Sequence, residues 1–212
     1  MRFLPEKRKR SIFLLTRGIP ALPSMASLGT EGITIDPPEG FSADVLSTTT
    51  GPNGEAVVTA TKTLKEVEFT VKGDTDLTGA KIKDSEVEIK ASSKTDTVSL
   101  TVDSSSFKKS EIVVAKGNAN IAFNTSVKKS DVICGKGDDK ITFGANAKVK
   151  KTTCDLGKKG TDSIVFEGNK ISGNLTVTNL GKGDSVTVGG ETTTYKEFKN
   201  GAEIKGLNVE LN

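Results

Sequence analysis

The chain has 212 residues, a formal net charge of +3, 34% hydrophobic and 5% aromatic residues, and no tryptophan. This composition is too lean for a wide globular core, but it suffices for a narrow core that is repeated along an axis. There is no histidine and there are two cysteines, so Ser-His-Asp and Cys-His catalytic arrangements cannot be built. The usual ligand set of a zinc enzyme is also missing. We therefore predict a protein that is not an enzyme and has no cofactor and no metal site.

The first 29 residues differ in chemistry from the rest of the chain. All four arginines lie within residues 1–17, and all six prolines lie within residues 1–52. Residues 1–17 carry a net charge of +5, whereas the remainder carries −2. The apolar run at 12–15 is shorter than the roughly 7–15 residues of a signal-peptide core, and no run reaches the roughly 20 residues of a membrane helix. We expect residues 1–29 to be an extended basic arm of the mature chain, with no membrane partner.

The arm mixes basic side chains with a short apolar run, which is typical of a segment that docks on another protein. Arginines pair well with carboxylates, and large apolar side chains fill grooves. A basic cluster also suits phosphates, but no aromatic platform accompanies this one, so nucleic acid is not favoured. The predicted partner-binding residues are Arg2, Arg8, Lys9, Arg10, Phe13, Leu14, Leu15 and Arg17.

A repeat of about 22 residues occupies residues 64–190. Apolar pairs with one residue between them recur at steps of 20, 25, 20, 22 and 21 residues: Val67/Phe69, Val87/Ile89, Ile112/Val114, Val132/Cys134, Cys154/Leu156 and Leu175/Val177. A second alternating segment, mostly Asp-x-apolar-x-apolar, follows most pairs and begins at Asp96, Ala119, Asp139, Asp162 and Asp184. A third apolar position closes most units: Ile82, Phe107, Val127, Val149 and Ile171.

Alternation with period two predicts short strands rather than helices. One unit cannot bury its apolar face alone, but stacked copies can. The repeat therefore predicts an all-β fold, a single-stranded parallel β-solenoid of about six to seven coils. Residues 30–63 would form an N-terminal cap or linker, and residues 191–212 a C-terminal cap with Tyr195 and Phe198. The alternative is a sandwich or barrel of short strands, which does not normally repeat one apolar register at near-constant spacing.

Lysine pairs open three successive units, at Lys108-Lys109, Lys128-Lys129 and Lys150-Lys151. In a solenoid they would stack into a basic stripe, which could meet an anionic glycan, nucleic acid or an acidic protein face. The alternative that we favour is a solvated face that discourages edge aggregation. Cys134 and Cys154 occupy different members of the apolar pair, so we expect buried free thiols rather than a disulfide.

The segment CGKGDDKIT, residues 134–142, resembles the nonapeptide repeat of RTX calcium-binding β-rolls. Gly135, Gly137 and Asp139 match the motif, and Cys134 stands in the place of its first glycine. That resemblance implies a calcium site made by backbone carbonyls and aspartate. The alternative, which we favour, is that Gly and Asp simply form tight corners.

The combination of Gly-Lys-Gly-Asp corners, Asp-x-apolar-x-Phe strands and Lys-Lys-Ser-acid openings in residues 64–190 resembles the repeats of virion structural proteins from marine tailed phages, including those of cyanobacteria. The resemblance implies a virion location as a head-decoration, neck or tail-fibre component. The arm would bind other virion subunits, and a homo-oligomer and a host-surface glycan are further partners compatible with this assignment. Two alternatives stay open: a secreted or surface RTX-like adhesin, and a phage spike acting on polysaccharide.

Overall fold

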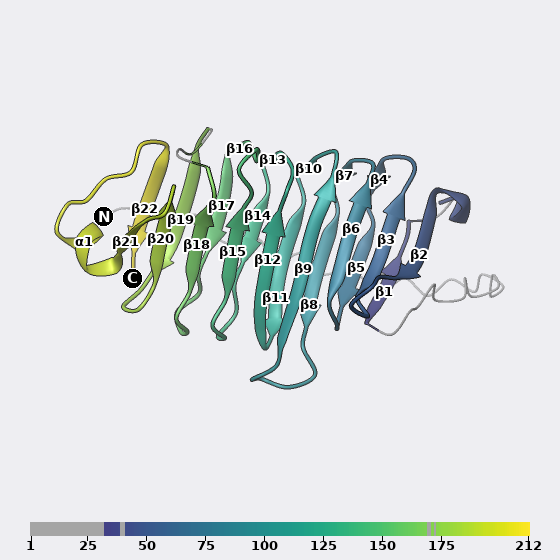
Figure 1. Ribbon diagram of the computed structural model, residues 1–212, viewed down its shortest axis with the longest axis horizontal. Helices are drawn as coiled ribbons and strands as arrows, with labels where there is room; N and C mark the ends of the chain where they lie inside the picture. The colour runs from purple at the N-terminus through teal and green to yellow at the C-terminus, as the bar shows by residue number, and fades with distance from the viewer. Residues whose placement is uncertain (1–31, 39–40, 169–170, 172) are drawn as a thin grey trace, which may run out of the picture.

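The computed structural model describes residues 32–38, 41–168, 171 and 173–212, and these residues are almost entirely β-structure. About six coils stack side by side along the long axis of the molecule (Figure 1). Strands of neighbouring coils pair in parallel, which confirms the predicted β-solenoid. The elongated shape follows directly from this stacking, because each added coil lengthens the molecule without widening its core.

The coils contribute strands to three sheets, which we name A, B and C. Sheet C is the shortest and consists of β4 (Leu64–Lys65), β7 (Ile82–Lys83), β10 (Phe107–Lys108), β13 (Val127–Lys128) and β16 (Val149–Lys150). Sheet A consists of β1 (Ile33–Asp36), β5 (Glu68–Val71), β8 (Glu86–Lys90), β11 (Glu111–Lys116), β14 (Asp131–Ile133), β17 (Thr152–Asp155), β19 (Leu175–Leu180) and β22 (Leu207–Leu211). Sheet B consists of β2 (Leu46–Thr50), β3 (Ala56–Ala60), β6 (Thr75–Gly79), β9 (Thr97–Ser104), β12 (Asn118–Phe123), β15 (Lys140–Phe143), β18 (Ser163–Phe166), β20 (Ser185–Val188) and β21 (Glu191–Thr194). Among the described residues, the coil of β19 and β20 has no strand in sheet C.

Antiparallel strands and a short helix distinguish the ends of the solenoid from its middle. At the N-terminal end β1 pairs antiparallel with β5, and β2, which follows the 3-10 helix η1 (Ala43–Val45), pairs antiparallel with β3. At the C-terminal end β21 folds back on β20, and α1 (Tyr195–Lys199) then buries Phe198. Parallel pairing begins between β3 and β6 and ends between β19 and β22. It therefore reaches beyond residues 64–190 in both directions.

The central inward row has the register that the repeat predicts. Val87 pairs with Ile112, Ile112 with Val132, and Val132 with Cys154, all in parallel strands. At the two ends of the series the predicted register is wrong by two residues. Phe69 rather than Val67 pairs with Val87, and Val177 rather than Leu175 pairs with Cys154. A shift of two residues keeps the same side chains on the inner face. The apolar pattern alone could therefore not distinguish the two registers.

The register predicted for the second alternating segment is wrong at Asp96. Val98 pairs with Ala119 and Leu100 with Ile121, which places Val98 rather than Asp96 in the row of Asp139. Asp96 instead lies in the exposed loop before β9, where its carboxylate accepts a hydrogen bond from the backbone of Ser93. Strand β9 has eight residues with three apolar inward positions, so the apolar pattern alone allowed more than one register.

Stacked phenylalanine rings fill the widest part of the core. The centroids of Phe123 and Phe143 lie 5.4 Å apart and those of Phe143 and Phe166 lie 4.8 Å apart, with nearly parallel planes. Phe107 of sheet C meets Phe123 at 5.7 Å in a tilted arrangement. Such pairs add stabilisation beyond the apolar area that they bury. The ladder therefore joins successive coils and also connects sheet C to sheet B.

Both cysteines are buried and free, as predicted. Cys154 pairs with Val132 across neighbouring strands, while Cys134 lies one inward position further along its own coil. Burial raises the pKa of both thiols. They therefore behave as small hydrophobic residues of the core.

Replacing Phe143 by alanine should lower the free energy of unfolding by about 3–5 kcal/mol, because the ring is fully buried between two others. Urea unfolding followed by circular dichroism measures the change. Leu211→Ala is the control, since this side chain is 41% exposed and its loss should cost less than about 1 kcal/mol. If F143A does not fold, F143L provides the measurement with an expected loss of about 1 kcal/mol. A loss below about 1 kcal/mol for F143A would contradict the ladder as a source of stability.

Candidate functional site

The corner between sheets C and A repeats one strained backbone conformation in five coils. A non-glycine residue with positive φ occupies the same place each time: Glu66 (58°), Asp84 (51°), Lys109 (52°), Lys129 (54°) and Lys151 (53°). The left-handed conformation costs an L-residue roughly 1–2 kcal/mol. Strain of this kind persists where the surrounding structure enforces it, and it often marks functional positions. The repeated strain makes this corner a candidate functional site.

At three of the five corners a buried serine follows the strained residue and holds the turn, whereas Val67 and Thr152 stand in its place at the other two. The Oγ of Ser85 accepts the backbone N–H of Val67 at 3.2 Å and donates to the carbonyl of Lys83 at 2.9 Å. Ser110 and Ser130 repeat both bonds one and two coils later. Each hydroxyl thus satisfies a backbone donor of the preceding coil that the strand ladder does not reach. The serines fix the corner and leave its charged residues facing outward.

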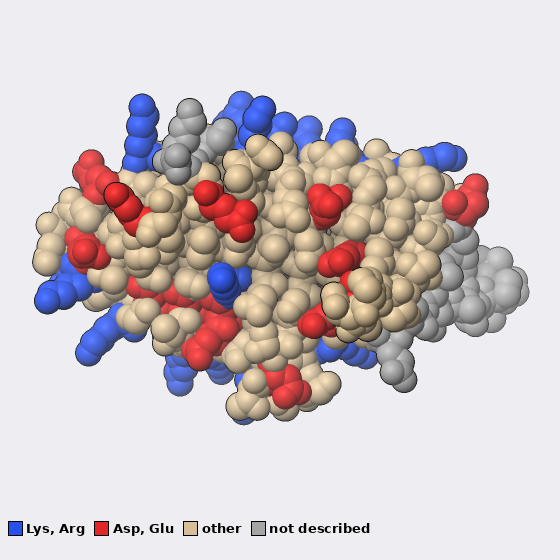
Figure 2. Space-filling view, viewed as in Figure 1, with Lys and Arg blue, Asp and Glu red and all other residues tan. Residues whose placement is uncertain are grey.

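Outward-facing lysines stack along this corner. The second residue of every sheet C strand is a lysine, and the five lysines pair in register. In the last three of these coils the strained position is also a lysine. We name the whole set the lysine ridge: Lys65, Lys83, Lys108, Lys109, Lys128, Lys129, Lys150 and Lys151. Blue side chains project along the upper edge in Figure 2, where Figure 1 labels the strands of sheet C.

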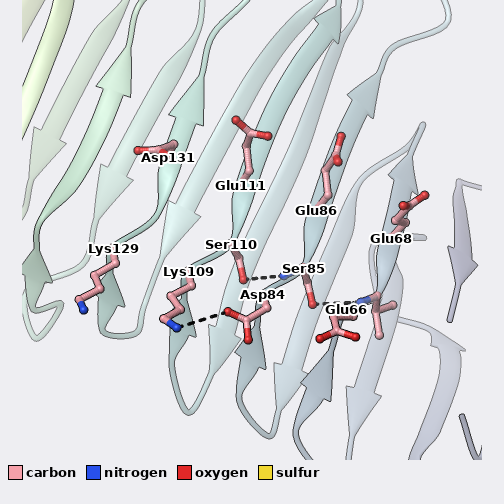
Figure 3. A pocket seen from close by; sticks show the side chains of 11 residues that line it. Glu66, Glu68, Asp84, Ser85, Glu86, Lys109, Ser110, Glu111, Lys129 and Asp131 are labelled. Atoms are coloured by element: carbon pink, nitrogen blue, oxygen red, sulfur yellow. Dashed lines mark hydrogen bonds and ion pairs between the residues drawn. The ribbon is translucent and has the colours of Figure 1, made fainter. Parts of the chain in front are cut away.

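A groove lined by carboxylates runs beside the ridge (Figure 3). The first residues of the sheet A strands pair in register, so Glu68 lies next to Glu86, Glu86 next to Glu111, and Glu111 next to Asp131. With Glu66, Asp84 and the lysines at 109 and 129 they line a groove of about 560 Å³. We name it the carboxylate groove.

Like charges repel within the carboxylate groove. Burial raises the pKa of Glu111, and the neighbouring charges of Glu86 and Asp131 raise it further. The residues with positive φ change from acidic to basic along the rod. Glu66 forms an ion pair with Lys65 at 2.6 Å, and Asp84 forms one with Lys83 at 3.2 Å. In the next three coils this position is a lysine. The N-terminal part of the corner is therefore neutralised, and the C-terminal part of the ridge is strongly positive.

A second ladder, of buried aspartates, lies at the corner between sheets A and B. Asp139 accepts the backbone N–H of Ala119 at 2.8 Å and that of Gly135 at 3.1 Å. Asp184 likewise accepts two backbone N–H groups, from Asp162 at 2.8 Å and Gly181 at 2.7 Å. Both oxygens of the motif residue Asp139 thus act as acceptors for the backbone. This geometry supports the interpretation that Gly and Asp form tight corners here.

Asp162 differs from its two ladder neighbours because it accepts one backbone hydrogen bond, from Asp139 at 2.7 Å. The loop before it is longer, and Gly157 donates its N–H to Asp155 instead. Burial, together with the charges of Asp139 and Asp184, raises the pKa of Asp162 to about 7, although the backbone hydrogen bond from Asp139 lowers it. The missing second donor therefore leaves Asp162 as the least stabilised carboxylate of the ladder.

The sequence predicted part of this arrangement. The three predicted lysine pairs do stack, as expected for a solenoid. The carboxylate groove was missed, because its acids follow no apolar pattern; the signal was the tetrapeptide Lys-Asp-Ser-Glu at 83–86, which recurs as Lys-Lys-Ser-Glu at 108–111 and Lys-Lys-Ser-Asp at 128–131. The predicted partner-binding residues of the arm, from Arg2 to Arg17, lie outside the described residues.

Comparisons with protein-family models, curated proteins and solved structures find no match for this chain. Among the described residues, no helix is long and apolar enough to cross a membrane. In the same part of the chain, no three or more Cys, Asp or Glu side chains form a group that could hold a metal ion.

We predict that the stability of the protein falls as pH rises from about 4 to about 7. The pKa of Asp162 is about 7 in the folded state and about 3.9 in an unfolded chain. The folded state therefore binds the proton more tightly in this window, and ionisation costs roughly 1–3 kcal/mol of unfolding free energy. Asp162→Asn should remove this loss, because the amide oxygen still accepts the N–H of Asp139 and does not titrate.

Chemical denaturation of the wild type and D162N at about pH 5 and about pH 8 tests this prediction. The variant should gain stability relative to the wild type as pH rises. Asp103→Asn, at an exposed position of β9, is the control and should show a pH-independent difference. A D162N difference that does not change with pH would contradict the assignment.

Glu111→Gln should stabilise the protein by about 0.5 kcal/mol at neutral pH, because it removes repulsion from two in-register carboxylates. The gain should shrink at high salt, which screens exposed charges. Thermal unfolding of E111Q at low and high salt measures the effect, with Glu210→Gln on the exposed side of β22 as the control. A destabilised E111Q would show that the carboxylate makes a favourable contact instead.

Proposed function

We propose that this chain is a non-enzymatic structural protein of a virion, in which the solenoid is a rigid rod and the N-terminal arm attaches it to the particle. The supporting observation is the continuous core, which runs through every coil from β3 to β22. A coil-on-coil core resists bending, because any bend must break several in-register ladders at once. The location is proposed from the resemblance of the repeats to those of marine tailed phages.

The charge distribution of the sequence also supports an attached rod. Residues 1–17 carry a net charge of +5, while the remainder of the chain carries −2. The basic and apolar side chains of the arm suit a docking role on an acidic and apolar surface of another subunit. The arm and the rod would thus perform separate tasks, attachment and display.

The RTX-like alternative is less well supported by the geometry of the aspartate corner. In that alternative Asp139 would bind calcium, whereas here its two oxygens accept backbone N–H groups of its own and the preceding coil. These two hydrogen bonds occupy both carboxylate oxygens of Asp139. Calcium should accordingly shift the thermal unfolding midpoint no more than magnesium does.

The proposal is tested by incorporation into particles. A tagged full-length chain supplied in trans should appear in purified particles, whereas the arm variant R8E/K9E/R10E should be lost from them, because its charges would repel the acidic docking surface. The matched control K158E/K159E/K182E makes the same change of charge at exposed corners of the solenoid, and it should be incorporated like the wild type. Absence of the wild-type chain from particles, or equal incorporation of the arm variant, would overturn the proposal. Circular dichroism of each variant confirms that the fold is kept.

A further inference from the structure

Among the described residues, few acidic side chains form ion pairs with the C-terminal part of the lysine ridge, although Glu111 and Asp131 lie beside it in the carboxylate groove. Within the described residues, the one ion pair of this part joins Lys109 to Asp84, at 4.0 Å. The five other lysines form no ion pair with a described residue: Lys108, Lys128, Lys129, Lys150 and Lys151. Most of these side chains are exposed. The ridge thus presents two columns of amines over three coils.

This arrangement costs stability in two ways. Like charges in register on neighbouring strands, roughly 4.8 Å apart, repel one another. Three of the lysines also occupy the left-handed conformation, in which glycine or asparagine would be less strained. The core does not require lysine at this position, since Glu66 and Asp84 occupy the same corner in two other coils. A ligand of opposite charge would offset the repulsion.

We propose that the lysine ridge binds a linear acidic polysaccharide, which lies along the solenoid axis with its anionic groups on successive coils. The ridge is straight, because every coil places its lysine directly over the preceding one. A narrow chain with an anionic group on each sugar, or on alternate sugars, can follow such a row. This activity belongs to the face of the rod and goes beyond the attachment role of the arm.

The carboxylate groove favours a narrow ligand. Glu86, Glu111 and Asp131 begin strands that directly follow the lysine corners, so a wide polyanion such as duplex DNA would also lie over these acids and be repelled. Single-stranded nucleic acid is narrow, but its binding sites use aromatic side chains on which bases stack. The outward residues of sheet C are lysines. The surface chemistry therefore suits a flexible polysaccharide better than either nucleic acid.

The experiment compares full-length variants that carry equal changes of charge. K108Q/K128Q/K150Q removes one lysine from each of three ridge coils, and K136Q/K158Q/K159Q removes three exposed lysines at the opposite corner as the matched control. The probes are polygalacturonate, which carries carboxylates, heparin, which is mainly sulfated, and single-stranded DNA of about 20 nucleotides. Calorimetric titration at about 50 and about 200 mM salt gives the affinities.

We expect the ridge variant to bind the two polysaccharides about tenfold more weakly and the control variant less than twofold more weakly. K108R/K128R/K150R should bind like the wild type, because it keeps the charge. Equal losses in the ridge and control variants would overturn the proposal, as would an absence of binding by the wild type at the lower salt concentration. Tighter binding of single-stranded DNA than of either polysaccharide at equal salt would instead identify a nucleic-acid surface. None of these results depends on whether the arm attaches the chain to a particle.

Discussion

The whole structure depends on in-register stacking of parallel coils. Each coil buries its inward residues against the equivalent residues of the next, as Phe123, Phe143 and Phe166 do. A single coil of about 22 residues is too thin to enclose a core, so its stability resides in the interfaces with its neighbours. Because strands of successive coils lie roughly 4.8 Å apart and pair largely in register, many positions become part of a ladder of similar residues.

Ladders of like residues have different energetic consequences for different side chains. Apolar ladders stabilise the fold, because the rings and methyl groups pack against one another. Serine and aspartate ladders also stabilise the fold, since each side chain accepts a hydrogen bond from a backbone N–H of the neighbouring coil. Ladders of like charge destabilise the fold, because they hold equal charges close together. Asp162 lies between these cases: it takes part in the ladder, but with one donor fewer than Asp139 or Asp184 it is held less favourably as an ion.

The sequence predicted the architecture and most of the central register, because inward apolar residues at near-constant spacing have few other solutions. It could not fix the register where a segment alternates for longer than one pair, as at Val67/Phe69 and around Asp96. A slip of two residues there leaves the same faces buried, and only the contacts with the neighbouring coil decide between the registers. The lysine stripe was predictable for the same reason as the core. The recurring acid after each Lys-x-Ser segment indicated a row of carboxylates, but the shape of the groove comes from a backbone turn with positive φ that lysine or aspartate would not suggest.

Surface charge can change from coil to coil of a solenoid while the backbone geometry stays the same. The two halves of the corner between sheets C and A differ in charge in this way. The backbone φ at Glu66 and Asp84 is close to that at Lys109, Lys129 and Lys151, so the charge at this position changes sign while the turn is kept. Near Lys65 and Lys83 the acids form ion pairs, which compensates the adjacent lysines. In the next three coils the ridge carries two lysines per coil, and their charges add to a more positive electrostatic potential there. The corner between sheets C and A is therefore more positive in its C-terminal coils than in its N-terminal coils.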